Sequence, residues 1–128
     1  MTYLITPPVT SAALNQLFAA AWENHQPRDF DPVLRHSLLY VCAYDDTKLV
    51  GFVNLAWDGG IHAFLLDTTV HLEYQHRGIG RRLVERAITA ARARSIEWIH
   101  VDFEPHLSDF YAACGFQSTP AGLINLKG

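Results

Sequence analysis

The pattern of apolar and polar positions divides this chain into short elements of changing period. Positions 3–5 predict a short strand that ends before two prolines. Apolar residues between positions 14 and 22 recur at helical spacing, and Thr10 and Ser11 precede them as candidate helix caps. Positions 24–31 are polar and predict a loop, after which Asp31 caps a second short helix that begins at Pro32.

Three apolar segments separated by turn sequences occupy the middle of the chain. Positions 38–44, 49–57 and 61–70 are rich in strand-forming residues. The segments between them, 45–48 and 58–60, contain the aspartates and glycines that are typical of tight turns. This arrangement predicts an antiparallel meander.

After Gly80 the period changes to that of an amphipathic helix, whose apolar face is formed by Leu83, Val84, Ala87, Ile88 and Ala91. Positions 98–103 then predict a strand, and positions 108–114 predict a short helix that Gly115 stops. Positions 123–126 are expected to form a last strand that closes the sheet. The fold class that follows is α+β, with a mixed, mostly antiparallel central sheet flanked by helices.

Composition and charge are those of a globular domain and argue against several kinds of binding partner. The chain has 128 residues, which fits one domain over positions 1–128, and 49% of them are hydrophobic. The formal net charge of -3 gives no reason to expect nucleic acid or an anionic membrane as a partner. The sequence shows neither a signal-peptide pattern nor an apolar run of the ~20 residues that span a bilayer, so we expect a cytoplasmic location. Cys42 and Cys114 are expected to be reduced thiols.

The segment from Val70 to Gly80 has the clearest chemical pattern. It predicts a strand that leads through a glycine-containing turn into a helix, whose first unpaired N–H groups and partial positive charge attract phosphate. Gly78 and Gly80 leave room for a phosphate to approach the backbone, and Arg77 and two arginines after Gly80 add positive charge. The glycines match neither the Walker A pattern nor the dinucleotide fingerprint. The pattern therefore predicts a pyrophosphate site of another kind.

Two signatures in this chain resemble those of the GCN5-related N-acetyltransferase (GNAT) family. The turn Gln75-His76-Arg77-Gly78-Ile79-Gly80 matches the pattern Gln/Arg-x-x-Gly-x-Gly/Ala after a strand. Downstream, Phe110-Tyr111-Ala-Ala-Cys-Gly115-Phe116 matches an aromatic–tyrosine pair followed by Gly-Phe. The resemblance covers nearly the whole chain, with a segment after Phe116 that is short for the family. It implies the acyl-CoA N-acyltransferase fold, in which two central strands splay apart into a V-shaped cleft.

The resemblance also implies a cosubstrate, acetyl-CoA, and a direct transfer of its acetyl group to a primary amine of a small molecule or peptide. Pantetheine would lie in the splay like an added strand and contact the backbone of Val70 and Leu72. The N–H groups of the turn would hold the pyrophosphate, from Gln75, His76, Arg77, Gly78, Ile79, Gly80 and Arg81. Leu72 stands where the family often has proline, and its additional N–H is a candidate donor to the thioester carbonyl. No metal is expected, and a homodimer is an expectation of the resemblance.

Three residues are candidates for catalysis, and each has a second interpretation. Tyr111 matches the family tyrosine that often protonates the departing sulfur and contacts the cofactor, or it is a packed aromatic residue beside Phe110 and Phe116. Asp67 stands where relatives often carry an acid, so it is either the general base or a polar residue that fixes a kink in the strand. Glu104 stands where relatives often have an asparagine, which makes it an alternative base.

Strand alternation would place four polar residues on one face of the strand after position 97, namely His100, Asp102, Glu104 and His106. Such a face suits the lining of an acceptor cleft, and a metal site is the less favoured interpretation. The acceptor itself would be chosen by the first helices, the loop at 24–31 and the residues after Phe116. The alternative function is a catalytically silent module that binds CoA or a partner on the same fold.

Overall fold

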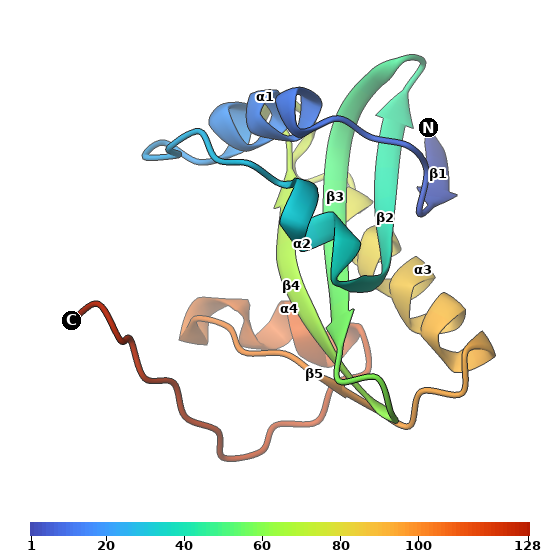
Figure 1. Cartoon of the computed structure of the whole chain (residues 1–128), viewed down its shortest axis with the longest axis vertical. Helices are drawn as coiled ribbons and strands as arrows, with labels where there is room; N and C mark the ends of the chain where they lie inside the picture. Colours follow the sequence, from blue (N-terminus) through green and yellow to red (C-terminus); the bar gives the residue numbers. More distant parts are fainter.

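A five-stranded sheet with helices on both faces forms the centre of the computed structural model, which describes all 128 residues (Figure 1). In their order across the sheet, the strands are β1 (Thr2–Ile5), β2 (Ser37–Asp45), β3 (Lys48–Trp57), β4 (His62–Val70) and β5 (Trp98–His100). The helices are α1 (Ser11–Ala21), α2 (Asp31–Arg35), α3 (Ile79–Ala93) and α4 (Ser108–Ala113), with 3-10 turns at Leu72–Tyr74 and Pro105–Leu107. All neighbouring strands are antiparallel except β4 and β5, which run parallel. The predicted fold class is therefore confirmed.

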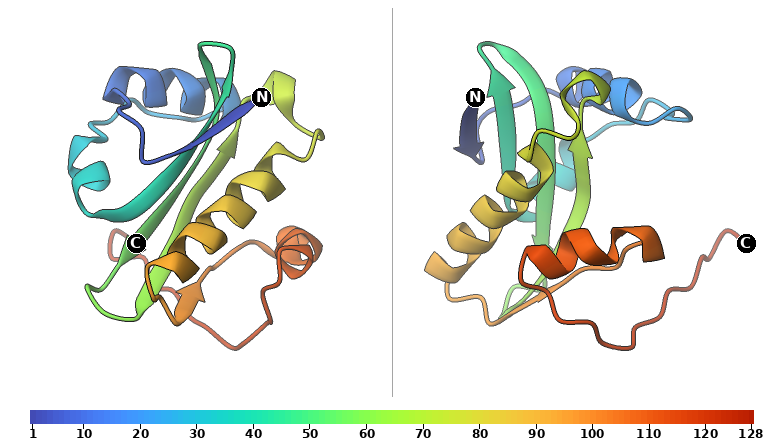
Figure 2. Two further views of the ribbon diagram at one scale, coloured as in Figure 1. Left: turned by 90° about the vertical axis from the view of Figure 1, so that its right-hand side faces the viewer. Right: turned by 180° about the vertical axis from the view of Figure 1, so that it is seen from behind.

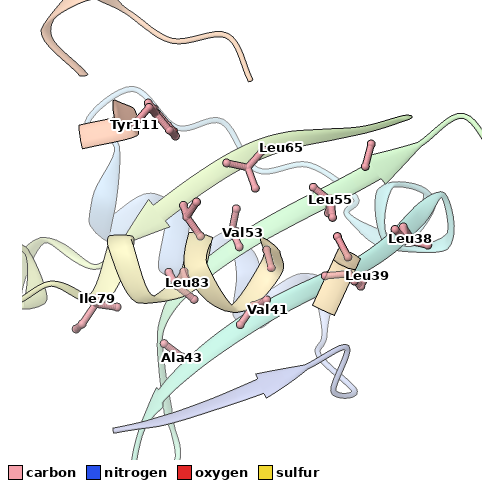
Figure 3. Close-up of a cluster of buried hydrophobic side chains, with 14 of the residues drawn as sticks. Leu38, Leu39, Val41, Ala43, Val53, Leu55, Leu65, Ile79, Leu83 and Tyr111 are labelled. Carbon is pink, nitrogen blue, oxygen red and sulfur yellow. The ribbon is translucent and has the colours of Figure 1, made fainter. Parts of the chain in front are cut away.

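Helix α3 covers one face of the sheet, and α1 and α2 cover the other (Figure 2). Under α3, the side chains of Leu83, Val84 and Ala87 are fully buried against the inner faces of β2, β3 and β4 (Figure 3). Burying a leucine or valine side chain stabilises a fold by roughly 1.5–3 kcal/mol. No helix in the structure is both long enough and apolar enough to cross a membrane.

The closest approach between α3 and the sheet occurs at Gly51 of β3. A Cβ atom at this position would lie 2.9 Å from Cδ1 of Leu83 and 3.2 Å from both Cγ2 of Ile79 and Cβ of Ala43. Only a residue without a side chain leaves room for the helix here, because Cβ atoms do not approach other heavy atoms within 3.0 Å. Gly51 thus sets the distance at which the beginning of α3 passes over β3.

Helices α1 and α2 both begin within one residue of the predicted positions. The Thr10 hydroxyl accepts a hydrogen bond of 3.0 Å from the N–H of Ala13, so Thr10 is the N-cap of α1. In α2 the N-cap is Phe30, and Asp31 is already the first helical residue. The predicted cap at Asp31 is therefore one position too late, and Phe30 is instead part of the core beneath α1 and α2.

The C-terminal part of the chain differs from the prediction in two places. Strand β5 ends at His100 instead of position 103, because its partner β4 pairs with it only from His62 to Phe64. Residues 123–126 form no strand, and Leu123, Ile124 and Leu126 are 78%, 86% and 93% exposed. Figure 1 shows this segment extending away from the sheet. Without a neighbouring strand to supply ladder hydrogen bonds, apolar strand-forming residues alone do not make a strand.

Candidate active site

A β-bulge in β4 opens the sheet at the site. Phe52 is paired with Thr69 and Asn54 with Leu66, so two residues of β4, Asp67 and Thr68, lie opposite one residue of β3. Asp67 adopts a left-handed conformation with φ of 59°, which is the backbone signature of such a bulge. Because β5 pairs with β4 only before this point, the β4 edge beyond the bulge has no strand beside it. The predicted splay between two central strands is confirmed.

The main chain of Val70 faces this open edge. The N–H of His71 donates to the carbonyl of Val50 at 2.8 Å, and Val70 lies opposite Gly51. In an antiparallel ladder this register directs the N–H and C=O of Val70 away from β3. The carbonyl accepts a hydrogen bond of 3.1 Å from Nε2 of Gln75. The Gln75 side chain therefore ties the turn after β4 to the strand.

The turn into α3 presents a row of main-chain donors. The N–H groups of residues 76–81 donate to no acceptor in the protein, and the first helical bond runs from the N–H of Arg82 to the carbonyl of Gly78. Gly78 is the N-cap, with φ of 80° and no capping side chain. His76 also has a positive φ, 63°. Free amides at a helix N-terminus attract anions, as the sequence pattern predicts.

A cavity of about 420 Å³ lies beside this turn, and we call it the turn cavity. Its walls come from the end of β4, the turn, the beginning of α3 and helix α4. The lining residues are Thr68, Val70, Tyr74, Gln75, His76, Gly78, Ile79, Gly80, Arg81, Leu107, Phe110 and Tyr111. The structure thus brings together eight of the ten residues predicted to bind the cofactor.

The two remaining residues of that prediction, Leu72 and Arg77, do not line the turn cavity. Leu72 begins a 3-10 turn and is 65% exposed. It therefore lies beyond the end of β4 and is not part of that strand's edge. The Arg77 guanidinium lies 5.0 Å from the ring centre of Tyr74, whose hydroxyl donates to a carboxylate oxygen of Asp45 at 2.6 Å. Strand β4 ends at Val70, as predicted, and His71 caps the 3-10 turn that follows by accepting a hydrogen bond from the N–H of Glu73. The role of the Leu72 N–H beside the acyl group stays a prediction.

Tyr111 is held on α4 between aromatic neighbours. Its ring stacks on Phe103 at 4.8 Å and meets the rings of Phe110 and Phe116 edge-on. Gly115, with φ of 102°, ends this region in a left-handed conformation and turns the chain so that Phe116 packs back on Tyr111. The Tyr111 hydroxyl donates a long hydrogen bond of 3.4 Å to Oγ1 of Thr68. The packing interpretation of Tyr111 is therefore observed, whereas its catalytic role stays a prediction for which the residue lies at the wall of the cavity.

Burial raises the pKa of Tyr111 above the usual value of 10, and Thr68, whose hydroxyl can donate to the phenolate, opposes this shift. The phenol is therefore protonated at neutral pH and can donate a proton. A thiol is a poorer candidate for chemistry here. Burial raises the pKa of Cys42 to about 12, and the residue is fully buried under α1. Burial also raises the pKa of Cys114, so neither cysteine has the character of a nucleophile.

A second hollow, of about 460 Å³, adjoins the turn cavity. Its lining consists of Trp22, Asp102, Phe103, Glu104, His106, Leu107, Tyr111 and Leu123. Tyr111 and Leu107 belong to the walls of both spaces. Two substrates in the two spaces would therefore meet at Tyr111.

The predicted polar face is only partly assembled. Asp102, Glu104 and His106 do line the second hollow together, but they follow irregular backbone and a 3-10 turn instead of strand alternation. His100 lies apart from them, with Nε2 of its ring 2.8 Å from Nδ1 of His62. Nδ1 of His106 lies 3.6 Å from Oε2 of Glu104. No group of three or more side chains in the structure is arranged to hold a metal ion.

Asp67 lies outside both spaces. Its carboxylate is 3.6 Å from the Arg28 guanidinium, and this contact joins the bulge to the loop after α1. Burial raises the pKa of Asp67, and Arg28 opposes the shift. Of the three candidate catalytic residues, the structure thus brings Tyr111 and Glu104 to adjoining walls and leaves Asp67 at the bulge.

Several residues that line the two spaces are not predicted from the sequence, and Thr68, Phe110 and Trp22 matter most for the chemistry. Thr68 contacts the Tyr111 hydroxyl, Phe110 lines the turn cavity beside Gly80, and Trp22 forms one wall of the second hollow. Phe110 precedes Tyr111 in the second signature, so its position carries a signal. No sequence motif marks Trp22 or Thr68. Trp22 reaches the site through the packing of α1, and Thr68 reaches it because of the extra residue in β4.

The site thus consists of a sheet that is open at one edge and, beside it, a helix N-terminus with free amides, an arrangement that suits an anion. Residues 11–116 match the model of the Acetyltransferase (GNAT) family. Two plant proteins are similar in sequence. GCN5-related N-acetyltransferase 1, chloroplastic, of Arabidopsis thaliana is 32% identical over 114 residues, which cover 86% of this chain and 57% of that protein. Serotonin N-acetyltransferase 2, chloroplastic, of Oryza sativa subsp. japonica is 30% identical over 115 residues, with coverages of 84% and 56%.

A solved structure has the same fold. The GNAT family acetyltransferase SP0256 from Streptococcus pneumoniae TIGR4 superposes with a TM-score of 0.77 at 24% identity, and the match covers 98% of each chain. This chain belongs to the GNAT family, as its two signatures indicate. It spans a little more than half the length of the two plant relatives.

Proposed function

We propose that this chain is an N-acetyltransferase that transfers the acetyl group of acetyl-CoA directly to a primary amine of a small molecule or peptide. The observation that carries the proposal is the row of free amides at residues 76–81, beside a cavity that meets a second hollow at Tyr111. Direct transfer requires two substrates to reach one point from separate sides. The name of the rice relative gives serotonin, an amine, as that protein's acceptor, which supports an amine here.

The residues of the turn cavity fit a coenzyme A thioester. The free amides and the helix N-terminus suit its diphosphate, and the open β4 edge at Val70 offers main-chain groups to an amide-containing chain such as pantetheine. A Cβ atom at Gly80 would already touch Phe110 at 3.5 Å and Val70 at 3.6 Å, so glycine keeps the space between them open. We assign the diphosphate to the amides of 76–81 and the pantetheine to the Val70 edge.

Acetyl-CoA supplies an activated acyl thioester, and the overall reaction converts an ammonium and a thioester into an amide, a thiol and one released proton. In our proposal Tyr111 gives its phenolic proton to the departing sulfur and regains one from the amine nitrogen as the amide forms. General acid catalysis of this type contributes typically ~10²–10⁴-fold to a rate. The raised pKa of Tyr111 keeps the acid in its proton-carrying form.

The first proton of the ammonium must leave before the nitrogen can attack. We assign this step to Glu104, which lines the second hollow and whose Oε2 lies 3.6 Å from Nδ1 of His106. Its side chain is 80% exposed, so water carries the proton on to solvent. Asp67 is assigned a structural role, because it pairs with Arg28 outside both spaces.

A binding measurement and a turnover measurement together test this proposal. Isothermal titration calorimetry should show acetyl-CoA binding, and release of free CoA thiol should exceed the rate without acceptor for at least one amine in a panel of amino acids, aromatic amines, polyamines, aminoglycosides and peptide N-termini. Binding without release above background across the panel would favour a catalytically silent CoA-binding module instead. Absence of acetyl-CoA binding would contradict the assignment of the turn.

Two further expectations of the sequence stay predictions. A cytoplasmic location is one, and fractionation of cells that express the tagged protein tests it. Assembly as a homodimer is the other, and sedimentation velocity at several protein concentrations tests it.

A further inference from the structure

The second hollow has the shape and chemistry of a binding site for one class of amine. We propose that it binds the acceptor, and that it selects small primary amines in which one cationic nitrogen is joined by a short chain to an aromatic body. This inference rests on the proposed function, since it names the substrate class of the same site. Three observations carry it: a fixed indole wall, two carboxylates with no lysine or arginine in the lining, and a shared wall with the turn cavity.

The indole of Trp22 is held in place although it faces solvent. Its Nε1–H donates to Oγ1 of Thr69 at 3.2 Å, and Thr69, which is 1% exposed, donates in turn to the carbonyl of Asp67 at 3.0 Å. The N–H of Trp22 donates to the carbonyl of Phe18 at 2.8 Å, where α1 ends. Trp22 nonetheless remains 53% exposed. A rigid, half-exposed indole is a surface on which an aromatic ring can be buried without further ordering of the protein.

The remaining apolar walls extend this surface. Phe103, Leu107 and Leu123 line the same hollow, so its interior is apolar on several sides. A volume of about 460 Å³ suits a small molecule, since small-molecule sites measure roughly 300–1,000 Å³. The hollow therefore has room for a ring and a short chain.

Carboxylates outnumber cationic groups in the lining of the hollow. Its lining contains the carboxylates of Asp102 and Glu104, together with the imidazole of His106, and no lysine or arginine. Arg28, the cation nearest to Trp22 in the sequence, pairs with Asp67 at the bulge. Negative potential in a cleft attracts cations and rejects amines that also carry a carboxylate or phosphate. Amino acids and sugar phosphates are therefore disfavoured as acceptors.

The position of the acids places the cation near the reacting centre. Tyr111 lines both spaces, and Asp102 contributes to the raised pKa of its phenol, although burial is the main cause. The field of Asp102 thus extends to the Tyr111 hydroxyl. An amine whose ring lies against Trp22 and whose nitrogen lies toward Asp102 and Glu104 directs that nitrogen to the shared wall.

A panel of amines at equal concentration tests the class with the unmodified protein. We expect kcat/KM for phenethylamine and tryptamine to exceed that for phenylalanine, glutamate and glucosamine 6-phosphate at least tenfold. Raising the salt concentration should raise KM for phenethylamine, because screening weakens the attraction of the two carboxylates. Equal kcat/KM for cationic and anionic amines would overturn the proposal.

Charge-removing variants test the residues. In Asp102→Asn combined with Glu104→Gln, we expect the calorimetric Kd of phenethylamine, measured with CoA present, to rise at least tenfold, while the Kd of acetyl-CoA stays within twofold of the wild-type value. Trp22→Leu should weaken phenethylamine binding at least fivefold, and Trp22→Phe should restore part of it. The matched control is Glu97→Gln, an exposed acid that lines neither space, which should bind phenethylamine as the wild type does.

The outcomes separate this inference from the proposed function. If acetyl-CoA binds and amines are acetylated, but the double variant binds phenethylamine with wild-type affinity, the acceptor class is wrong and the function stands. If acetyl-CoA does not bind, the function itself fails.

Discussion

The hydroxyl of Tyr111 on α4 and Oγ1 of Thr68 in the β4 bulge lie 3.4 Å apart and join the two walls of the turn cavity. Thr68 reaches this place because the bulge inserts one residue and turns its side chain toward α4. The contact places the phenolic oxygen beside β4, at the wall that the turn cavity shares with α4. Removing either oxygen separates the packing role of Tyr111 from its chemical role.

Tyr111→Phe should therefore lower kcat for amine acetylation at least tenfold while acetyl-CoA still binds. The phenylalanine ring keeps the contacts with Phe103, Phe110 and Phe116, and only the proton donor is lost. Steady-state CoA release gives kcat, and calorimetry gives the Kd of acetyl-CoA. Tyr3→Phe on β1, far from both spaces, is the control for loss of a tyrosine hydroxyl. An unchanged kcat would remove Tyr111 from the mechanism.

Gly80→Val should abolish acetyl-CoA binding. A Cβ atom at position 80 makes ordinary contacts with Phe110 and Val70, so Gly80→Ala fits and is the matched control. The two additional methyl groups of valine would extend between these side chains and fill the space beside the free amides. Calorimetry on both variants measures the effect, and thermal unfolding establishes that both are folded. Wild-type affinity in a folded Gly80→Val protein would refute the assignment of the turn.

Gly51→Ala should destabilise the fold by about 1–3 kcal/mol, the range for overpacking a well-filled core. The new methyl group would lie 2.9 Å from Cδ1 of Leu83 and 3.2 Å from Ile79 and Ala43, so the buried Leu83 side chain or α3 itself must shift. Urea unfolding followed by circular dichroism gives the free energy of unfolding. Gly122→Ala is the control, since no atom lies within 4 Å of a Cβ there. Equal free energies of unfolding for the two variants would contradict the expectation that the added methyl group overpacks the contact between β3 and α3.

Asp67→Asn should gain stability relative to the wild type as the pH rises. Burial raises the pKa of Asp67, so the folded protein keeps its carboxyl proton at pH values where the unfolded chain has lost it. The contribution of Asp67 to stability is therefore largest below the unfolded pKa and is lost as the pH rises through the folded pKa. Asparagine cannot ionise, and it tolerates the left-handed backbone of the bulge.

Thermal unfolding of both proteins between pH 3 and pH 7 measures this difference. The midpoint of Asp67→Asn should move upward relative to the wild type across that range. Asp67→Ala lacks the same tolerance for a positive φ and should be less stable than Asp67→Asn at every pH. A wild-type advantage that grows with pH would show that the Arg28 ion pair outweighs burial.

The sequence predicts those parts of the fold and site that depend on local residue chemistry. The turn at 75–80 is predictable because its glycines permit the left-handed conformation that Gly78 adopts at the N-cap, and α3 is predictable from its apolar period. The strand predicted to reach position 103 is an instructive failure. Val101 and Phe103 do pack against the core, so the alternation reports burial correctly. The alternation cannot show that residues 101–103 lack hydrogen bonds to a neighbouring strand, because this depends on where β4 and β5 separate.

The second hollow could not be predicted for a related reason. Trp22 and Glu104 come from segments far apart in the chain, and they share a wall only because α1 ends beside the β4 bulge. The local sequence around Trp22 or Glu104 gives no indication that the two residues line the same hollow. The same holds for Thr68, whose orientation depends on the bulge. Sites made by packing therefore require the structure, whereas sites made by one turn do not.

The hydrogen-bond donors along residues 76–81 are main-chain N–H groups, which limits the ways in which pH or mutation can change their binding of an anion. Peptide N–H groups do not ionise at physiological pH, and no ordinary side-chain replacement deletes them; only proline does, by occupying the nitrogen. The contribution of these amides to diphosphate affinity should thus be the same from pH 6 to pH 9. In our proposal the cofactor is held largely by main-chain atoms and the acceptor by side chains, so mutation of those side chains should change the acceptor without loss of the cofactor.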